Sequence, residues 1–229
     1  MTPDPRPIPR FIASNSQEGI PYGRFEGRIR EPFLEACRQI GDLPADAPPA
    51  GEVTWFPERA WGGRVWVPAT ARGGEGETEI EYFGHVSYER PDDGEPSDFR
   101  ASADFTDVIA EDNPDWRIDL NDDVIGRWRG ETGMAGEVTL VWGRPLVPGA
   151  VAATAELEGN VVDQEAIADG RFTLVALDAL EGYGDDVYLE VKLWNRRADE
   201  LAAESLYDQF EEEDEADEAP PAGPDSSAG

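Results

Sequence analysis

Apolar and polar residues alternate with a period of two along most of residues 53–195. In residues 78–90 one face of this alternation is apolar and the other is mixed: the first holds Ile80, Tyr82, Val86 and Tyr88, and the second holds Glu79, Glu81, Phe83, His85 and Ser87. Similar sets recur in residues 99–105, 116–120, 138–142, 151–157, 172–176 and 187–193. A period of two is typical of β-strands, so the segment is predicted to be rich in strands.

Turn-forming residues separate the alternating sets. Glycine and Asx clusters stand at residues 73–74, 92–94, 121–123, 159–160, 169–170 and 182–184. Short strands at such spacing, with no helical patterns between them, favour antiparallel sheets over a parallel βαβ arrangement. We therefore expect a mainly β fold, an antiparallel β-sandwich or β-barrel of about nine or ten strands.

Helical patterns flank the predicted strands on both sides. Pro32 suits the first position of a short N-terminal helix, in which Phe33 and Cys37 follow at helical spacing, and Gly41 is placed to end it. A C-terminal helix is expected over residues 197–210. Its rough apolar stripe consists of Ala198, Leu201, Ala202, Leu206 and Phe210.

The chain divides into three parts by composition. Residues 1–10 carry a proline at nearly every second position and read as an extended arm. Residues 11–210 are predicted to form a single β-rich domain. Residues 211–229 begin with a run of five acidic residues and continue in Pro, Ala, Gly and Ser, a composition typical of a disordered tail.

The charge of the chain narrows the set of partners. Its 229 residues include 50 Asp and Glu against 19 Lys and Arg, which gives a net charge of −31. So negative a chain is repelled by nucleic acid and by anionic membrane surfaces, so we expect neither as a partner. No apolar run approaches the roughly 20 residues that span a bilayer, and the first residues lack a signal-peptide pattern. The predicted location is the cytoplasm.

His85 is the single histidine of the chain, and it shares a strand face with Glu81. A carboxylate two residues away on the same face is placed to orient the imidazole as a general base, which suggests a hydrolase or an isomerase. The alternative is a structural histidine in a half-buried strand. Since no nucleophile motif accompanies His85, the structural interpretation is favoured.

Two other features bear on metal and thiol chemistry. Cys37 is the single cysteine, which excludes an internal disulfide, and its place on an apolar stripe predicts a buried thiol that packs as a small hydrophobe. Asp119, Asn121 and Asp123 resemble the first half of a calcium loop. The loop lacks the glycine and the bidentate glutamate that follow in such sites, since Gly130 occupies the last position. We therefore predict no metal and no cofactor.

The Asx cluster at residues 121–123 predicts a tight hairpin between Leu120 and Val124. In that register Arg117 lies opposite Arg127, with Arg129 just beyond. Like charges in direct opposition need a neutralising group. Either acidic side chains of this protein supply it, or the three arginines bind an anionic ligand such as a carboxylate.

The sequence contains no phosphate-binding, nucleophile-elbow or zinc-binding motif, which lowers the expectation of an enzyme. Many strands, abundant aromatic residues and small residues on predicted inward faces favour a non-catalytic carrier. Its ligand would be a small apolar or amphipathic molecule in a barrel or sandwich pocket. The first alternative is an acidic module that docks on a basic protein surface. The second is the hydrolase or isomerase built on His85.

Overall fold

The computed structural model describes residues 20–21, 23–91, 95–129, 135–157, 159–180 and 189–206. In these residues the chain forms twelve β-strands, one α-helix and two short 3-10 helices. All strand pairs are antiparallel. The expected mainly β class is therefore confirmed. The predicted arm at residues 1–10 and tail at residues 211–229 lie outside the described residues.

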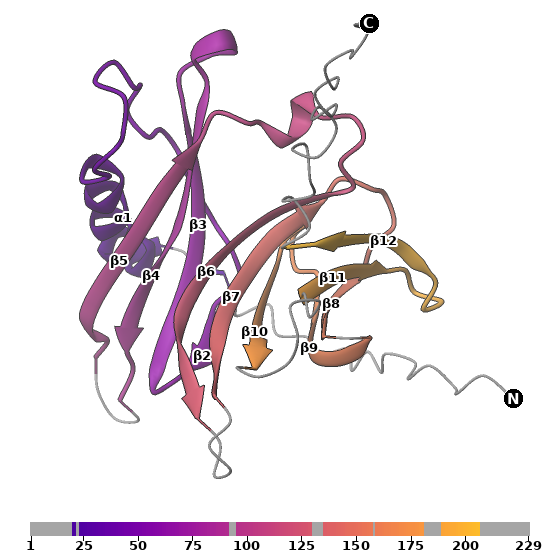
Figure 1. Cartoon of the computed structure of the whole chain (residues 1–229). Helices are drawn as coiled ribbons and strands as arrows, with labels where there is room; N and C mark the ends of the chain where they lie inside the picture. The colour runs from indigo at the N-terminus through magenta and orange to yellow at the C-terminus, as the bar shows by residue number, and fades with distance from the viewer. Residues whose placement is uncertain are drawn as a thin grey trace, which may run out of the picture.

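The N-terminal part of the fold is a five-stranded sheet, here called sheet A, with a helix on one face (Figure 1). The strand order is β1-β3-β4-β5, and β2 also pairs with β3. The elements are α1 (Gly23–Arg38), β1 (Val53–Trp55), β2 (Arg59–Trp61), β3 (Arg64–Gly73), η1 (Gly76–Thr78), β4 (Ile80–Glu89), β5 (Ser97–Thr106) and η2 (Ala110–Asp112).

Two further sheets follow. Sheet B has the order β10-β7-β6, and sheet C has the order β12-β11-β8-β9. Their strands are β6 (Ile118–Arg129), β7 (Ala135–Pro145), β8 (Ala152–Leu157), β9 (Asn160–Ala166), β10 (Phe172–Leu180), β11 (Leu189–Trp194) and β12 (Glu200–Ser205). Figure 1 shows the layers in the sequence α1, sheet A, sheet B and sheet C. This stacking agrees with the sandwich alternative, and none of the three sheets closes on itself within the described strands.

Three buried clusters hold the layers together. The first lies between α1 and sheet A, where Ile29, Phe33 and Cys37 of the helix are all at most 2% exposed. Their spacing of four residues places them on one helical face. Sheets A and B share a second cluster of Phe56, Trp66, Leu140 and Trp142, and sheets B and C share a third around Val141, Phe172, Leu174, Leu189, Val191 and Leu193.

Strand β7 lies in the central layer, so both of its faces are buried. Leu140 and Trp142 belong to the cluster with sheet A, whereas Val141 between them belongs to the cluster with sheet C. Burial of a Leu or Val side chain stabilises the fold by about 1.5–3 kcal/mol. In the described residues no helix combines the length and apolarity needed to cross a bilayer.

The N-terminal helix is longer than the sequence indicates. It begins at Gly23, so Pro32 lies in its interior instead of at its first position. Proline removes one backbone hydrogen bond there, at a cost of about 3 kcal/mol in an isolated helix. Burial of Ile29, before the proline, and of Phe33, after it, offsets that cost by packing the whole helix on sheet A.

The predicted C-terminal helix is wrong for residues 200–205, which form strand β12. This strand pairs with β11 in the register Leu193↔Ala202 and Lys192↔Ala203. Ladder hydrogen bonds and the burial of Ala202 outweigh the helical preference of the Leu-Ala-Ala-Glu stretch. Residues 207–210 of the prediction lie outside the described residues.

The predicted hairpin at residues 121–123 is also wrong. Strand β6 runs through these residues without a turn and pairs along its length with β7, for example Leu120↔Gly143 and Val124↔Thr139. The polar side chains that suggested a turn lie in a strand whose partners come from elsewhere in the fold. The register that placed Arg117 opposite Arg127 is therefore not formed.

Candidate functional site

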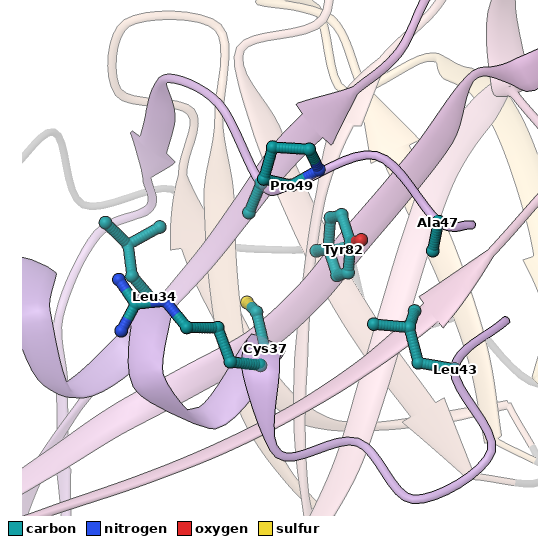
Figure 2. Close-up of a pocket in the computed structure, with 8 residues that line it drawn as sticks. Leu34, Cys37, Leu43, Ala47, Pro49 and Tyr82 are labelled. Atoms are coloured by element: carbon teal, nitrogen blue, oxygen red, sulfur yellow. The ribbon is translucent and has the colours of Figure 1, made fainter. Parts of the chain in front are cut away.

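An apolar pocket of about 310 Å³ lies between the C-terminal half of α1, residues 43–50 and strand β4. Figure 2 shows its wall residues converging from the helix, the connecting segment and the strand. The lining consists of Leu34, Cys37, Arg38, Leu43, Ala47, Pro49, Ala50 and Tyr82. Its volume falls at the lower end of the range of small-molecule pockets, about 300–1,000 Å³.

The polar atoms of the pocket wall are already neutralised or satisfied. The Tyr82 hydroxyl donates a hydrogen bond of 2.5 Å to the carbonyl oxygen of Pro48. Burial raises the pKa of the Cys37 thiol to about 11, so the sulfur is protonated at neutral pH. Both side chains consequently present apolar surface to the pocket, although each carries a heteroatom.

Arg38 is the one charged residue among the described residues that line this pocket. Its side chain is exposed, and its Nη1 lies 2.6 Å from Glu35 Oε2 and 3.4 Å from Glu31 Oε1. Exposed pairs of this kind contribute about 0–1 kcal/mol, so another anion is able to compete for the guanidinium. The pocket therefore joins an apolar interior to a cationic rim.

His85 lies on the opposite face of sheet A, where it points towards sheet B. Its nearest carboxylate is Asp123 of β6, at 3.2 Å between Nδ1 and Oδ2. The contact has an ion-pair distance but not the geometry of a hydrogen bond, so Nδ1 is buried without a hydrogen-bond partner. The Trp66 ring packs against the imidazole at 5.0 Å between centroids.

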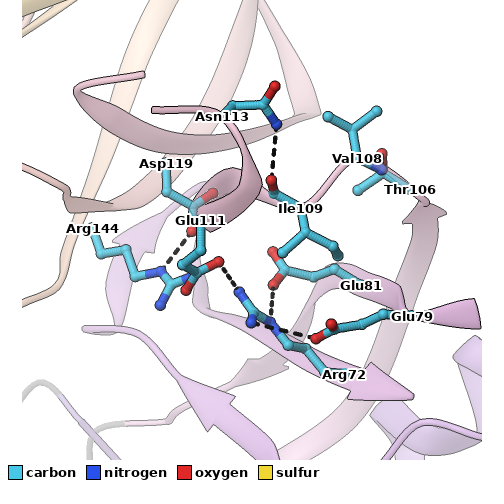
Figure 3. Close-up of polar contacts among 10 residues, drawn as sticks. All are labelled: Arg72, Glu79, Glu81, Thr106, Val108, Ile109, Glu111, Asn113, Asp119 and Arg144. Atoms are coloured by element: carbon cyan, nitrogen blue, oxygen red, sulfur yellow. Dashed lines mark hydrogen bonds and ion pairs between the residues drawn. The ribbon is translucent and has the colours of Figure 1, made fainter. Parts of the chain in front are cut away.

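Glu81 does not contact His85; it joins an ion network between sheets A and B (Figure 3). Arg72 Nε lies 3.0 Å from Glu81 Oε2, and its guanidinium also reaches Glu79 and Glu111. Arg144 of β7 continues the network with contacts of 2.6 Å to both Glu111 and Asp119.

The network holds its carboxyl groups at different pKa values. Burial, followed by the charge of Asp119, raises the pKa of Glu81 above its ordinary value. Burial also acts to raise the pKa of Glu111, but the hydrogen bond from Arg72 and the charge of Arg144 lower it overall. Since each buried carboxylate here has an arginine partner, the arrangement is typical of structural ion pairs between layers.

The three arginines expected to gather at one site are dispersed. The Arg117 guanidinium donates to the carbonyl oxygen of Leu201 in β12. Arg127 is exposed and lies 3.3 Å from Glu137, its cross-strand neighbour. Arg129 stands at the end of β6, opposite Ala135. The acidic alternative foreseen for Arg127 is the one observed.

Asp119, Asn121 and Asp123 alternate along β6 and do not surround a common point as a calcium loop does. Asp119 is bound to Arg144 and Asp123 faces His85. No group of three or more His, Cys, Asp or Glu side chains in the described parts of the chain has a geometry suited to a metal ion.

Two features of these sites could not be found from the sequence. Asp123 is 38 residues from His85 and was assigned to a turn, so no local spacing relates them. The apolar pocket depends on Leu43 and Ala47, which stand in a segment read as a linker. Its one sequence signal is the Cys37 position on the apolar helix face.

The comparisons with known proteins leave the sites described above as the evidence for function. No protein-family model matches the sequence, and neither the curated proteins nor the solved structures contain a similar chain.

Proposed function

We propose that the protein is a non-catalytic binding protein that holds a small amphipathic molecule in the apolar pocket between α1 and β4. The observation that carries the proposal is a 310 Å³ pocket whose described wall is apolar apart from Arg38. The pocket lies beside a filled core and not inside a barrel, so its entrance is on the molecular surface, where a ligand reaches it without unfolding the sheets.

The size and charge of the pocket define the ligand class. If one non-hydrogen atom occupies about 30 Å³, the share of a water molecule in the liquid, the pocket holds roughly ten such atoms. A carboxylate head would displace Glu35 or Glu31 from Arg38, and an alkyl tail would contact Leu34 and Leu43. Octanoate, with ten non-hydrogen atoms, is the matching probe.

The first test is a chain-length series of straight carboxylates measured by isothermal titration calorimetry. Each buried methylene contributes about 0.8 kcal/mol, so affinity should rise about fourfold per methylene. The rise should stop near eight carbons because the pocket is then full. Absence of saturable binding throughout the series, together with no retained ligand in native mass spectrometry, would refute the proposal.

A matched pair of variants locates the binding. Ala47→Phe places a ring in the pocket wall and should weaken octanoate binding at least tenfold. Ala45→Phe makes the same change two residues away, at an exposed position outside the lining, and should leave affinity unchanged. Equal affinities in the two folded variants would place the ligand elsewhere.

A second candidate, a hydrolase or isomerase, rests on the short contact between His85 and Asp123. A carboxylate at Nδ1 would orient the imidazole and leave Nε2 to act on a substrate. No hydroxyl or thiol donates a hydrogen bond to His85 within the described residues. For this reason the binding function is preferred.

A further inference from the structure

A second cavity, of about 140 Å³, lies between sheets A and B. It is separate from the apolar pocket, which lies on the helix side of sheet A. We call it the acidic cavity, and its lining consists of Phe83, Gly84, Ser102, Ala103, Asp104, Asp122, Asp123 and Trp142. Four strands supply these residues, β4 and β5 from sheet A and β6 and β7 from sheet B.

The charge of the acidic cavity differs from that of the other polar regions between layers. Elsewhere inward-facing carboxylates are matched by a base, as Asp119 is by Arg144 and Glu156 is by Lys192 at 2.9 Å. The described lining of the acidic cavity holds three aspartates and no basic residue. Among the described residues, neither Asp104 nor Asp123 has an arginine or lysine within ion-pair distance.

His85 provides an independent indication of a ligand. Its side chain is 9% exposed, and its Nδ1 lies 3.2 Å from Asp123, which lines the cavity, yet makes no hydrogen bond. An unpartnered buried nitrogen costs about 1–3 kcal/mol, which a hydrogen-bond donor in the cavity would remove. In the neutral imidazole Nδ1 accepts such a bond when Nε2 carries the proton.

We propose that the acidic cavity binds a small organic cation that carries several N–H donors, such as an alkylguanidinium. The carboxylates come from two facing sheets, Asp104 from β5 and Asp122 and Asp123 from β6, so a planar guanidinium spans them better than a single ion does. The described groups do not converge as a metal site requires.

The remaining walls of the acidic cavity suit the same class of ligand. Phe83 and Trp142 place aromatic rings beside the aspartates. A cation near an aromatic face gains about 0.5–2 kcal/mol, and guanidinium groups stack on such faces readily. At about 30 Å³ for each non-hydrogen atom, the cavity holds roughly five such atoms. Methylguanidinium has five and is the probe we choose.

The test is calorimetric titration of the full chain with methylguanidinium chloride at constant ionic strength. Tetramethylammonium is the control ligand because it has the same charge and the same number of non-hydrogen atoms but no N–H donor. We expect one saturable site for methylguanidinium and weaker binding, by about tenfold or more, for the control. Equal heats for the two cations would reveal general charge attraction and overturn the proposal, as would no saturable binding.

Two aspartate variants separate the site from the overall charge. Asp123→Asn removes a carboxylate of the cavity and should weaken methylguanidinium binding about tenfold, the effect of losing one charge-assisted hydrogen bond. Asp107→Asn removes the same charge from an exposed position outside the lining and should leave binding unchanged. Indistinguishable affinities in these variants would also overturn the proposal. Ala47→Phe should have no effect on this ligand, which keeps the result independent of the apolar pocket.

Discussion

Cys37 lies where α1 meets β4, and burial raises the pKa of its thiol to about 11. The residue contributes packing to the wall of the apolar pocket, as its place on the helical stripe predicts. A thiol reacts through its thiolate, whose fraction at pH 8 falls about a hundredfold when the pKa rises by two units. The environment of one residue thus determines whether the pocket is reactive.

This pKa shift predicts slow alkylation of Cys37 by iodoacetamide. At pH 8 the rate for the native protein should be about a hundredfold below that for the protein in 8 M urea, where the thiol regains its ordinary pKa. Because the pKa is raised, the native rate should climb about tenfold per pH unit and level only near pH 11. Mass spectrometry follows the reaction directly. A native rate that levels off at pH 9 would contradict the assignment.

At the scale of single residues, the sequence predicted the type of environment better than the identity of contacts. The alternation in residues 78–90 correctly separated the buried face of Tyr82 and Val86 from the face that carries Glu81 and His85. It could not show which carboxylate approaches His85, because Asp123 comes from another sheet. Periodicity records which way a side chain points and carries no information on what meets it.

At the scale of elements, the network centred on Arg72 and Arg144 connects β3 of sheet A with β7 of sheet B through Glu111. Glu81 is 7% exposed and Asp119 is 7% exposed, so both depend on their arginine partners. Leaving a buried carboxylate unpaired costs more than the ion pair itself contributes. The network therefore constrains how the two sheets stack.

We predict that Arg72→Met lowers the free energy of unfolding by about 2–3 kcal/mol, below the full value for a buried pair because Arg72 is partly exposed. The double variant Arg72→Met/Glu81→Gln should recover about 1 kcal/mol of this loss, since the buried side chain left behind is uncharged. Urea denaturation of both variants measures the effect.

The control for this prediction is Arg127→Met, which removes an exposed arginine paired with Glu137. Its effect should stay below about 0.5 kcal/mol. If Arg72→Met were no more destabilising than Arg127→Met, the network would have no structural role. Failure of the double variant to recover stability would instead assign the loss to the packing of the Arg72 stem.

Local sequence patterns predicted some elements correctly and misassigned those decided by distant partners. The strands at residues 78–90 and 138–142 were predicted because their alternation is strong. Strand β6 was read as a turn because Asn121, Asp122 and Asp123 favour turns in isolation, whereas β7 holds them in a ladder. Likewise β12 was read as a helix, and its pairing with β11 overrode local preference.

At the scale of the whole molecule, both candidate sites lie at boundaries between layers. The apolar pocket opens where α1 meets sheet A, and the acidic cavity opens where sheet A meets sheet B. Sheet A therefore separates the two sites, with Tyr82 and Phe83, neighbours in β4, facing opposite sides. A ligand at either site contacts two layers and would resist their separation.

The charge of the molecule leads to a prediction about salt. At a net charge of −31, repulsion among acidic groups opposes the compact state. Potassium chloride shortens the screening length from about 30 Å at 0.01 M to about 3 Å at 1 M, which weakens that repulsion. The melting temperature should therefore rise by several degrees, since each kcal/mol moves it by about 2–4 °C in a protein of this size.

The form of the salt dependence identifies its cause. Screening changes most steeply at low concentration, so the melting temperature should gain most of its increase below about 0.5 M and then approach a plateau. Exclusion of salt from the protein surface acts differently, because sulfate strengthens apolar burial and its effect grows with concentration. Differential scanning calorimetry in potassium chloride and in potassium sulfate at matched ionic strength separates the two. Coincident curves below 0.5 M would confirm screening, and a melting temperature that does not respond to potassium chloride would show that repulsion does not limit stability.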